Sequence, residues 1–134
     1  MTQEELDGCK LLAEWLYPEM LDSILIDKYG VEVDGNLFAK MALYSKNYDL
    51  LKYHSSYDWI MDVIEKIEKI GNYTIKTLTT KTLRCEGFTY KIELFDNIKT
   101  YNPHISIESD YINNESQIST YFRFCIVFVK WYNS

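Results

Sequence analysis

The stretch YHSSYDWIMDVIEKIEKI, residues 53–70, decides how the rest of the chain folds. Ser55 or Ser56 can cap a helix here, and Asp58 falls in its first turn, where a negative charge complements the helix dipole. The Gly-Asn pair at residues 71–72 marks the end of the helix. Five apolar side chains then share one face of this helix: Ile60, Val63, Ile64, Ile67 and Ile70. The opposite face carries Asp62, Glu65, Lys66, Glu68 and Lys69. Burying five branched aliphatic side chains contributes several kcal/mol, so the apolar face requires a packing partner.

The sequence that follows predicts this partner, a small antiparallel sheet. Its segments are rich in β-branched and aromatic residues and alternate in polarity. We expect strands at residues 73–78, 82–85, 88–94 and 104–108, with a tight turn at residues 86–87. In the third strand Tyr90, Ile92 and Leu94 would meet the helix, and Thr89, Lys91 and Glu93 would point outward.

Helices are expected at both ends of the chain. Thr2 and Glu5 fit a capping box that starts a first helix, and this helix should end near Tyr17 because Pro18 disfavours helical geometry before it. The last helix should start at about Ser116 or Ser119. It is apolar on more than one side, which predicts either broad burial or a homodimer interface along residues 122–131. Its apolar side chains are Phe122, Phe124, Cys125, Ile126, Val127, Phe128, Val129, Trp131 and Tyr132.

The signals between these elements are mixed. Residues 19–29 predict a second, short helix that stops at Gly30. Residues 31–33 alternate like a short strand, and residues 37–44 satisfy both the helical and the strand period. The whole pattern predicts one α+β domain over residues 1–134, with a small antiparallel sheet layered with helices.

Composition restricts the classes of partner. A net charge of −6 disfavours a protein that binds nucleic acid directly by neutralising phosphates, whereas it suits a basic partner. An acidic, polar start and the lack of a long uninterrupted apolar run predict a cytoplasmic protein with no membrane association. Three widely spaced cysteines, Cys9, Cys85 and Cys125, predict buried reduced thiols.

The start of the central helix holds the residues closest to a functional site. His54, the two serines that follow it and Asp58 offer the residue types of nucleophilic catalysis, but helix capping already explains the serines and Asp58. Tyr57 and Trp59 could stack on a flat ligand or anchor a partner, although packing against the sheet explains them better. We therefore take Tyr53, His54, Tyr57, Asp58 and Trp59 as candidate binding residues. No metal-binding or phosphate-binding motif is present, so we expect neither a metal nor another cofactor.

The same region carries a resemblance to a known family. Residues 53–71 resemble a segment of small bacteriophage and prophage proteins in which tyrosine, histidine, serine and a tryptophan-aspartate-tryptophan run lead into a helix ending valine-glutamate-lysine-isoleucine-glutamate. Residues 11–15 (LLAEW) resemble the opening helix of that family, and residues 127–133 (VFVKWYN) resemble its closing helix. This is the phage ABA-sandwich type, and the resemblance implies helices layered on a small sheet. Tyr57 replaces the usual first tryptophan and Asp62 a frequent proline, which implies a straighter start to the helix here. The family offers no catalytic residues to carry over.

Two functions of different classes follow. The first is a non-enzymatic phage or prophage accessory protein that binds a host or phage protein in the bacterial cytoplasm, with a role against a host defence system. The second is a small-molecule or nucleotide-ligand binding protein with an aromatic pocket at Tyr53, Tyr57 and Trp59; an enzyme ranks third. The first predicts an exposed aromatic or acidic patch and no deep pocket, and the second predicts a concave site where these rings meet polar groups.

Overall fold

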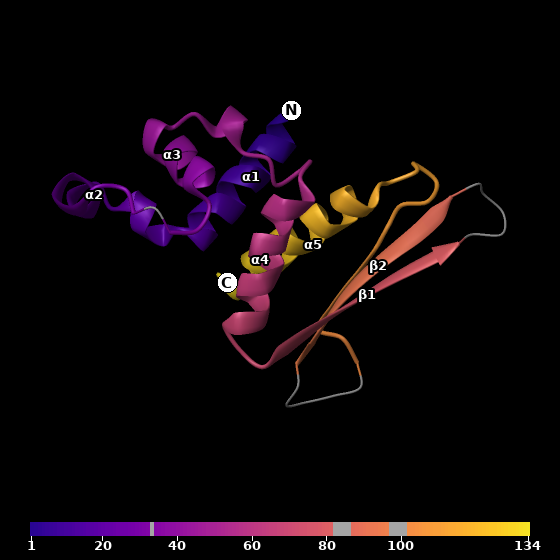
Figure 1. The fold of residues 1–134 in the computed structure, drawn as a ribbon. Coiled ribbons are helices and arrows are strands. Elements are labelled where there is room, and N and C mark those ends of the chain that lie inside the picture. The colour runs from indigo at the N-terminus through magenta and orange to yellow at the C-terminus, as the bar shows by residue number, and fades with distance from the viewer. Residues whose placement is uncertain (33, 82–86, 97–101) are drawn as a thin grey trace.

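The computed structural model describes residues 1–32, 34–81, 87–96 and 102–134. Within these residues the fold is α+β, with helices at both ends and a three-stranded antiparallel sheet (Figure 1). The predicted fold class is therefore confirmed. The strands are β1 (Tyr73–Lys81), β2 (Phe88–Asp96) and β3 (Ile105–Glu108), in the order β1-β2-β3. The predicted strand at residues 82–85 and the first residue of the predicted turn at 86–87 lie outside the described residues.

The sheet presents one apolar face to the helices. Ile92 and Leu94 of β2 are fully buried, and Tyr90 on the same face is half-buried, as the alternation predicted. The pairing of Leu94 with Ile105 brings β3 into the same apolar face. The outer face is polar by comparison, with alternating threonine, lysine and glutamate side chains along β1 and β2.

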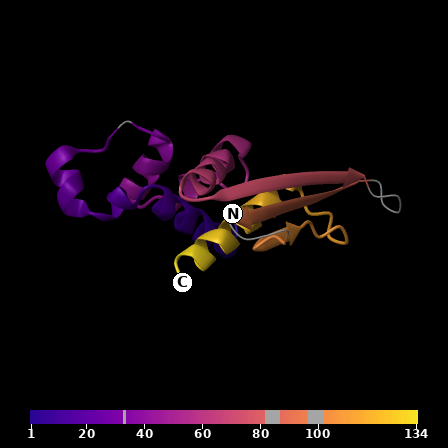
Figure 2. The same cartoon turned by 90° about the horizontal axis from the view of Figure 1, so that it is seen from below.

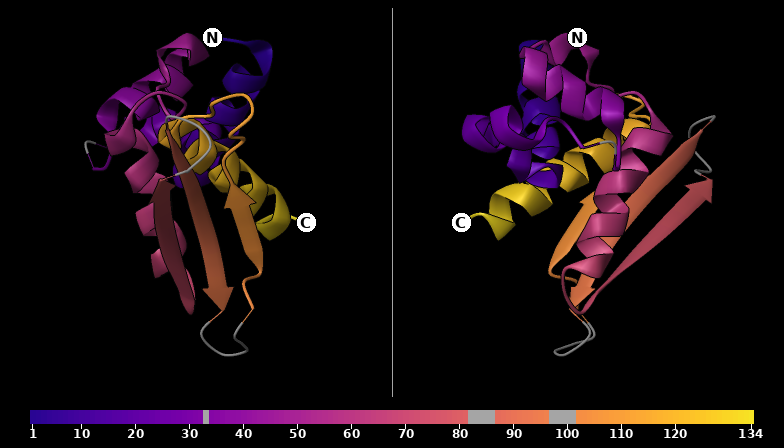
Figure 3. Two further views of the ribbon diagram at one scale, coloured as in Figure 1. Left: turned by 90° about the vertical axis from the view of Figure 1, so that its right-hand side faces the viewer. Right: turned by 60° about the vertical axis from the view of Figure 1, so that its left-hand side comes forward.

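The helices lie on one side of this sheet. Helices α4 (Tyr57–Lys69) and α5 (Gln117–Tyr132) pack directly on the strands, and α1 (Gln3–Leu16) packs on α4 and α5 from the far side (Figure 3). Helix α1 begins with the predicted capping box, in which Thr2 Oγ1 accepts from the Glu5 backbone N–H and Glu5 Oε1 accepts from the Thr2 N–H. It approaches α5 closely at Gly8, where a Cβ atom would lie 2.7 Å from the Phe122 ring.

Helix α4 forms where the sequence predicted it. Ser56 is its cap, and four of its five apolar side chains are buried. The fifth, Ile70, is exposed, so its predicted burial is wrong; it lies after the last helical residue. On the predicted polar face Lys66 is only half-exposed, because its ammonium reaches the end of α1.

The segment before α4 differs most from the prediction. The single helix at residues 19–29 is wrong: the chain forms a short 3-10 helix, η1 (Pro18–Leu21), and then a separate helix, α2 (Ser23–Tyr29). Asp22 divides them because its Oδ1 accepts from the backbone N–H groups of Ile24 and Leu25 and so caps α2. Gly30 ends α2 with a φ of 74°, as predicted.

The next two ambiguous segments are also resolved. Residues 31 and 32 form no strand, and residue 33 lies outside the described residues. Residues 37–44 belong to helix α3 (Leu37–Ser45), which Asn36 caps by accepting from the Ala39 N–H. A second 3-10 helix, η2 (Tyr48–Leu50), connects α3 to the start of α4.

Helix α5 buries most of its apolar side chains inside the chain. Its neighbours are α1, α4 and two strands, and its buried residues include Phe124, Cys125, Phe128 and Val129. Broad burial therefore explains most of the apolar character of this helix, while Val127, Trp131 and Tyr132 are exposed. Cys9 and Cys125 are free, buried thiols, as predicted, and Cys85 lies outside the described residues.

Candidate functional site

The segment leading into α4 divides its candidate residues between separate environments. Tyr53 is fully buried and packs edge-on against Trp59, with 5.1 Å between the ring centroids. Its hydroxyl has no hydrogen-bond partner among the described residues, and burial raises its pKa well above the usual range. Trp59 is half-buried and covers the Tyr53 ring. This pair holds the first turn of α4 against the core.

His54 lies on the other side of this segment, next to Cys9. The His54 Nδ1 atom is 3.5 Å from Cys9 Sγ, and the imidazole packs edge-on against Phe122. A cysteine and a histidine at this distance resemble the nucleophile and base of a thiol enzyme. Burial raises the pKa of Cys9 to about 11, however, so at neutral pH the sulfur is a thiol without nucleophilic character.

Tyr57 and Asp58 point in different directions from the start of α4. The Tyr57 hydroxyl donates to Gln117 Oε1 at 2.7 Å and so connects α4 to α5. Asp58 is exposed and lines a cleft that Trp59 also lines. Of the five predicted binding residues, Asp58 and Trp59 line the same cleft. The structure does not assemble the five into one site.

This cleft has a volume of about 570 Å³ and separates α4 from the chain between α1 and α3. The Tyr17 hydroxyl accepts a hydrogen bond from the Asn36 N–H at 2.7 Å, which holds the turn at Gly35 beside the cleft. Partial burial raises the pKa of Asp62, and the nearby carboxylates of Glu65 and Asp58 raise it further. The cleft thus combines aromatic rings with three carboxylates and the ammonium groups of Lys66 and Lys69.

Lys66 fixes one end of the same cleft. Its Nζ donates to the Trp15 carbonyl at 2.6 Å and to the Leu16 carbonyl at 3.3 Å, and it lies 4.5 Å from the Trp15 ring centroid. These carbonyls are at the end of α1, where the helix leaves its last C=O groups without partners of its own. Lys66 is therefore occupied in joining α4 to α1.

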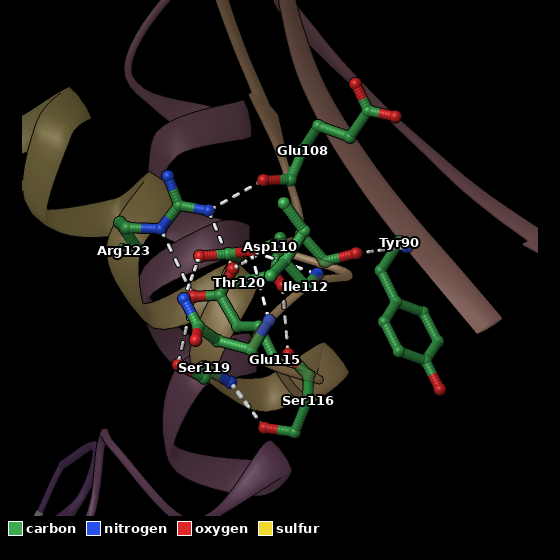
Figure 4. Close-up of polar contacts among 11 residues, drawn as sticks. Tyr90, Glu108, Asp110, Ile112, Glu115, Ser116, Ser119, Thr120 and Arg123 are labelled. Atoms are coloured by element: carbon green, nitrogen blue, oxygen red, sulfur yellow. Dashed lines mark hydrogen bonds and ion pairs between the residues drawn. The ribbon is translucent and has the colours of Figure 1, made fainter. Parts of the chain in front are cut away.

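A polar cluster between β3 and α5 is also used within the chain (Figure 4). Arg123 donates to the Glu108 carbonyl and to Glu115, each at 2.7 Å. Glu115 also accepts from the Asp110 N–H and from the Ser119 hydroxyl. Partial burial acts to raise the pKa of Glu115, but these hydrogen bonds and the charge of Arg123 outweigh it and lower the pKa. The cluster fastens the loop before α5.

The most exposed apolar region lies elsewhere, on η1, α2 and α3. We call it the α2–α3 surface, and it lies at the end of the molecule opposite the β1–β2 hairpin (Figures 1 and 2). Ile24 is 76% exposed and Phe38 is 78% exposed. Helix α2 has no buried residue at all. The exposed apolar side chains of the surface are Leu21, Ile24, Leu25, Tyr29, Leu37, Phe38, Met41 and Tyr44.

The sequence does not mark these residues as a site, although it contains one signal of their exposure. Residues 37–44 fit both the helical and the strand period because apolar side chains lie on every side of the helix. The inward face buries Ala39, Ala42 and Leu43, and the outward face is left with Phe38 and Met41 in solvent. A helix that is apolar all round needs two partners. The chain supplies one of them.

Among the described residues, no group of three or more histidine, cysteine, aspartate or glutamate side chains could hold a metal ion. In the same part of the chain, none of the helices is both long and apolar enough to cross a bilayer. Comparison with the known protein families, with curated proteins and with solved structures found no match.

Proposed function

We propose that this chain is a non-enzymatic protein-binding protein whose partner docks on the α2–α3 surface. The observation that carries the proposal is the exposure of eight large apolar side chains on three consecutive elements. Single exposed apolar residues are common on folded proteins, but a concentration of them marks an interaction surface. The surface is also aromatic, as the protein-binding hypothesis expected, since Tyr29, Phe38 and Tyr44 belong to it.

The resemblance to the phage ABA-sandwich type supports a biological setting for this proposal. In that setting the chain is a phage or prophage accessory protein in the bacterial cytoplasm, and its partner is a host or phage protein. A small protein that acts by binding another protein suits a role in inhibiting a host defence system. This part of the proposal rests on the motifs at residues 11–15, 53–71 and 127–133.

The cleft beside α4 favours a second candidate, a small-molecule or nucleotide-ligand binding function. Its volume of about 570 Å³ falls within the range of ligand pockets, roughly 300–1,000 Å³. Trp59 and Tyr17 supply aromatic surface, and Asp58 supplies a polar group. Three carboxylates line the cleft against two lysines, and Lys66 already contacts the end of α1, so the cleft suits a cationic ligand better than a phosphate-bearing one.

The first test compares two isoleucines that are almost equally exposed. Ile24 on α2 is 76% exposed and Ile112, in the loop before α5, is 79% exposed. We would capture proteins from bacterial extract with the wild type, Ile24→Ser, Phe38→Ser and Ile112→Ser, and analyse both proteins and retained small molecules by mass spectrometry. Any captured protein would then be purified and its affinity for each variant measured by calorimetry.

We expect the wild type and Ile112→Ser to bind this purified partner equally, and Ile24→Ser and Phe38→Ser to bind it at least tenfold more weakly, as for residues central to an interface. Equal loss in Ile24→Ser and Ile112→Ser would overturn the proposal. A retained small molecule without a protein partner would favour the cleft, and Trp59→Ala should then abolish retention.

A further inference from the structure

Carboxylates outnumber lysines around the α2–α3 surface. Residues 17–36 contain five carboxylates against one lysine, and α3 with its cap adds two more lysines, so residues 17–46 carry a net charge of −2 out of −6 for the whole chain. The five carboxylates and two of the three lysines are exposed, and Lys40 is buried: the exposed side chains are Glu19, Asp22, Asp27, Lys28, Glu32, Asp34 and Lys46. An exposed apolar surface with an excess of one sign of charge favours a partner of the opposite sign.

Two of these carboxylates have partners within the chain. Glu19 lies 3.6 Å from Nζ of the buried Lys40, and Asp22 caps α2. Asp27 and Glu32 each line one of two grooves that flank α2, Asp27 together with Lys46 and Glu32 together with Glu19 and Lys40. The groove with Asp27 has a volume of about 340 Å³ and includes Tyr44; the groove with Glu32 has a volume of about 240 Å³. Carboxylates therefore line the same hollows as apolar side chains.

The outward face of α3 has the dimensions of a helix-binding stripe. Leu37, Met41 and Tyr44 stand at i, i+4 and i+7 on one side of the helix, and Phe38 lies beside them. Nine residues of α-helix extend over about 13 Å, which matches two to three turns of a partner helix laid along it. The spacing suits apolar anchors that repeat with the helical period in the partner.

We infer that the partner segment is a basic amphipathic helix, with apolar side chains on one face and lysine or arginine on its flanks. This inference rests on the proposed function of the α2–α3 surface and names the chemistry of its ligand. The apolar face would cover Phe38 and Met41, and the cations would approach Asp27 and Glu32. An anionic membrane would be repelled by the same carboxylates. A second copy of this chain would bring like charges together and is disfavoured for the same reason.

The test uses a model peptide of about 15 residues, long enough to populate a helix. Leucines repeat on one face and lysines flank them, and a fluorophore reports binding by anisotropy. Three further peptides separate the contributions: one with glutamate for lysine, one with glutamine for lysine, and one with the same composition in scrambled order. Affinities are measured between about 50 mM and 300 mM salt, because the screening length shortens across this range.

The protein variants match the two parts of the inference. Asp27→Asn and Glu32→Gln remove charge beside α2, and Glu68→Gln removes an exposed carboxylate from α4 as a control. Ile24→Ser and Phe38→Ser remove apolar contact, with Ile112→Ser as their control. We expect each of the first two charge variants to weaken the lysine peptide roughly two- to fivefold and the control to leave it unchanged.

Support requires that the lysine peptide binds best, that salt weakens it and that the scrambled peptide fails. If the glutamate or glutamine peptide binds equally well, the assigned charge of the partner is wrong. If no peptide binds while Ile24→Ser still abolishes binding to the purified natural partner, the inference fails and the proposed function stands. Binding to anionic vesicles, or an Ile24→Ser-sensitive dimer of the chain, would also overturn it.

Discussion

Replacing Lys66 with methionine should lower the free energy of unfolding by about 2 kcal/mol. The substitution keeps the aliphatic stem but removes the ammonium that reaches the Trp15 and Leu16 carbonyls. A buried hydrogen bond to a charged group contributes about 1.5–3 kcal/mol, but here the side chain is half-buried, so water replaces part of that and about 1 kcal/mol is lost. Losing the contact with the Trp15 ring adds about 0.5–1 kcal/mol. Losing a cation at the end of α1 costs about 0.5 kcal/mol more. Partial burial lowers the pKa of Lys66, so methionine also removes the desolvation cost of the ammonium, which offsets this last contribution.

Thermal and urea unfolding followed by circular dichroism would measure this effect. For a chain of this size 2 kcal/mol corresponds to a fall in Tm of about 7 °C. Lys69→Met is the matched control, because Lys69 is an exposed lysine one turn further along α4. Lys66→Arg should recover part of the loss, since it retains the charge. The reasoning is refuted if Lys66→Met and Lys69→Met have the same Tm.

The remaining predictions concern pH and backbone geometry. Glu115→Gln should destabilise the chain by about 1 kcal/mol at pH 7. Because the pKa of Glu115 is lowered in the folded chain, the difference in stability between this variant and the wild type should shrink as pH falls from about 4.5 through the lowered pKa. Urea titrations at several pH values would measure this difference. Asp62→Asn should raise Tm at pH 7, since the raised pKa of Asp62 disfavours its ionised form in the fold, and the gain should vanish below about pH 3.8. Gly30→Ala and Gly35→Ala should each cost about 1 kcal/mol for a positive φ. Calorimetry should show a further loss of about 1 kcal/mol for Gly35→Ala alone, because its Cβ would lie 2.9 Å from the Tyr17 ring, whereas the space at Gly30 is open.

The sequence predicted the elements whose signals agree with one another. The capping box at Thr2, the Ser56 cap and the alternation through Ile92 and Leu94 each combine a local propensity with a burial pattern. Such agreement leaves few alternatives for the fold. The start of α4 was predicted for the same reason. Its residues make separate contacts and do not form one site: Tyr53 packs on Trp59, His54 lies beside Cys9, and Tyr57 bonds to α5.

What the sequence did not predict depends on contacts between distant segments. Asp22 splits the helix expected at residues 19–29 because a capping side chain competes with helix continuation, and only the position of η1 decides between them. Lys66 belongs to the charged face of α4 by periodicity, yet the end of α1 lies within its reach. The exposure of Phe38 likewise depends on which side of α3 the rest of the chain covers.

Helix α2 has a consequence for the local opening of the native chain. It is seven residues long, contains no buried residue and packs only on η1 among the described elements. Helices this short are barely stable alone, so α2 should open independently of the core, with amide hydrogens that exchange orders of magnitude faster than those of α5. A partner bound to Ile24 and Leu25 would have to keep α2 folded. Slowed exchange confined to this one helix would then locate the docking site without any substitution.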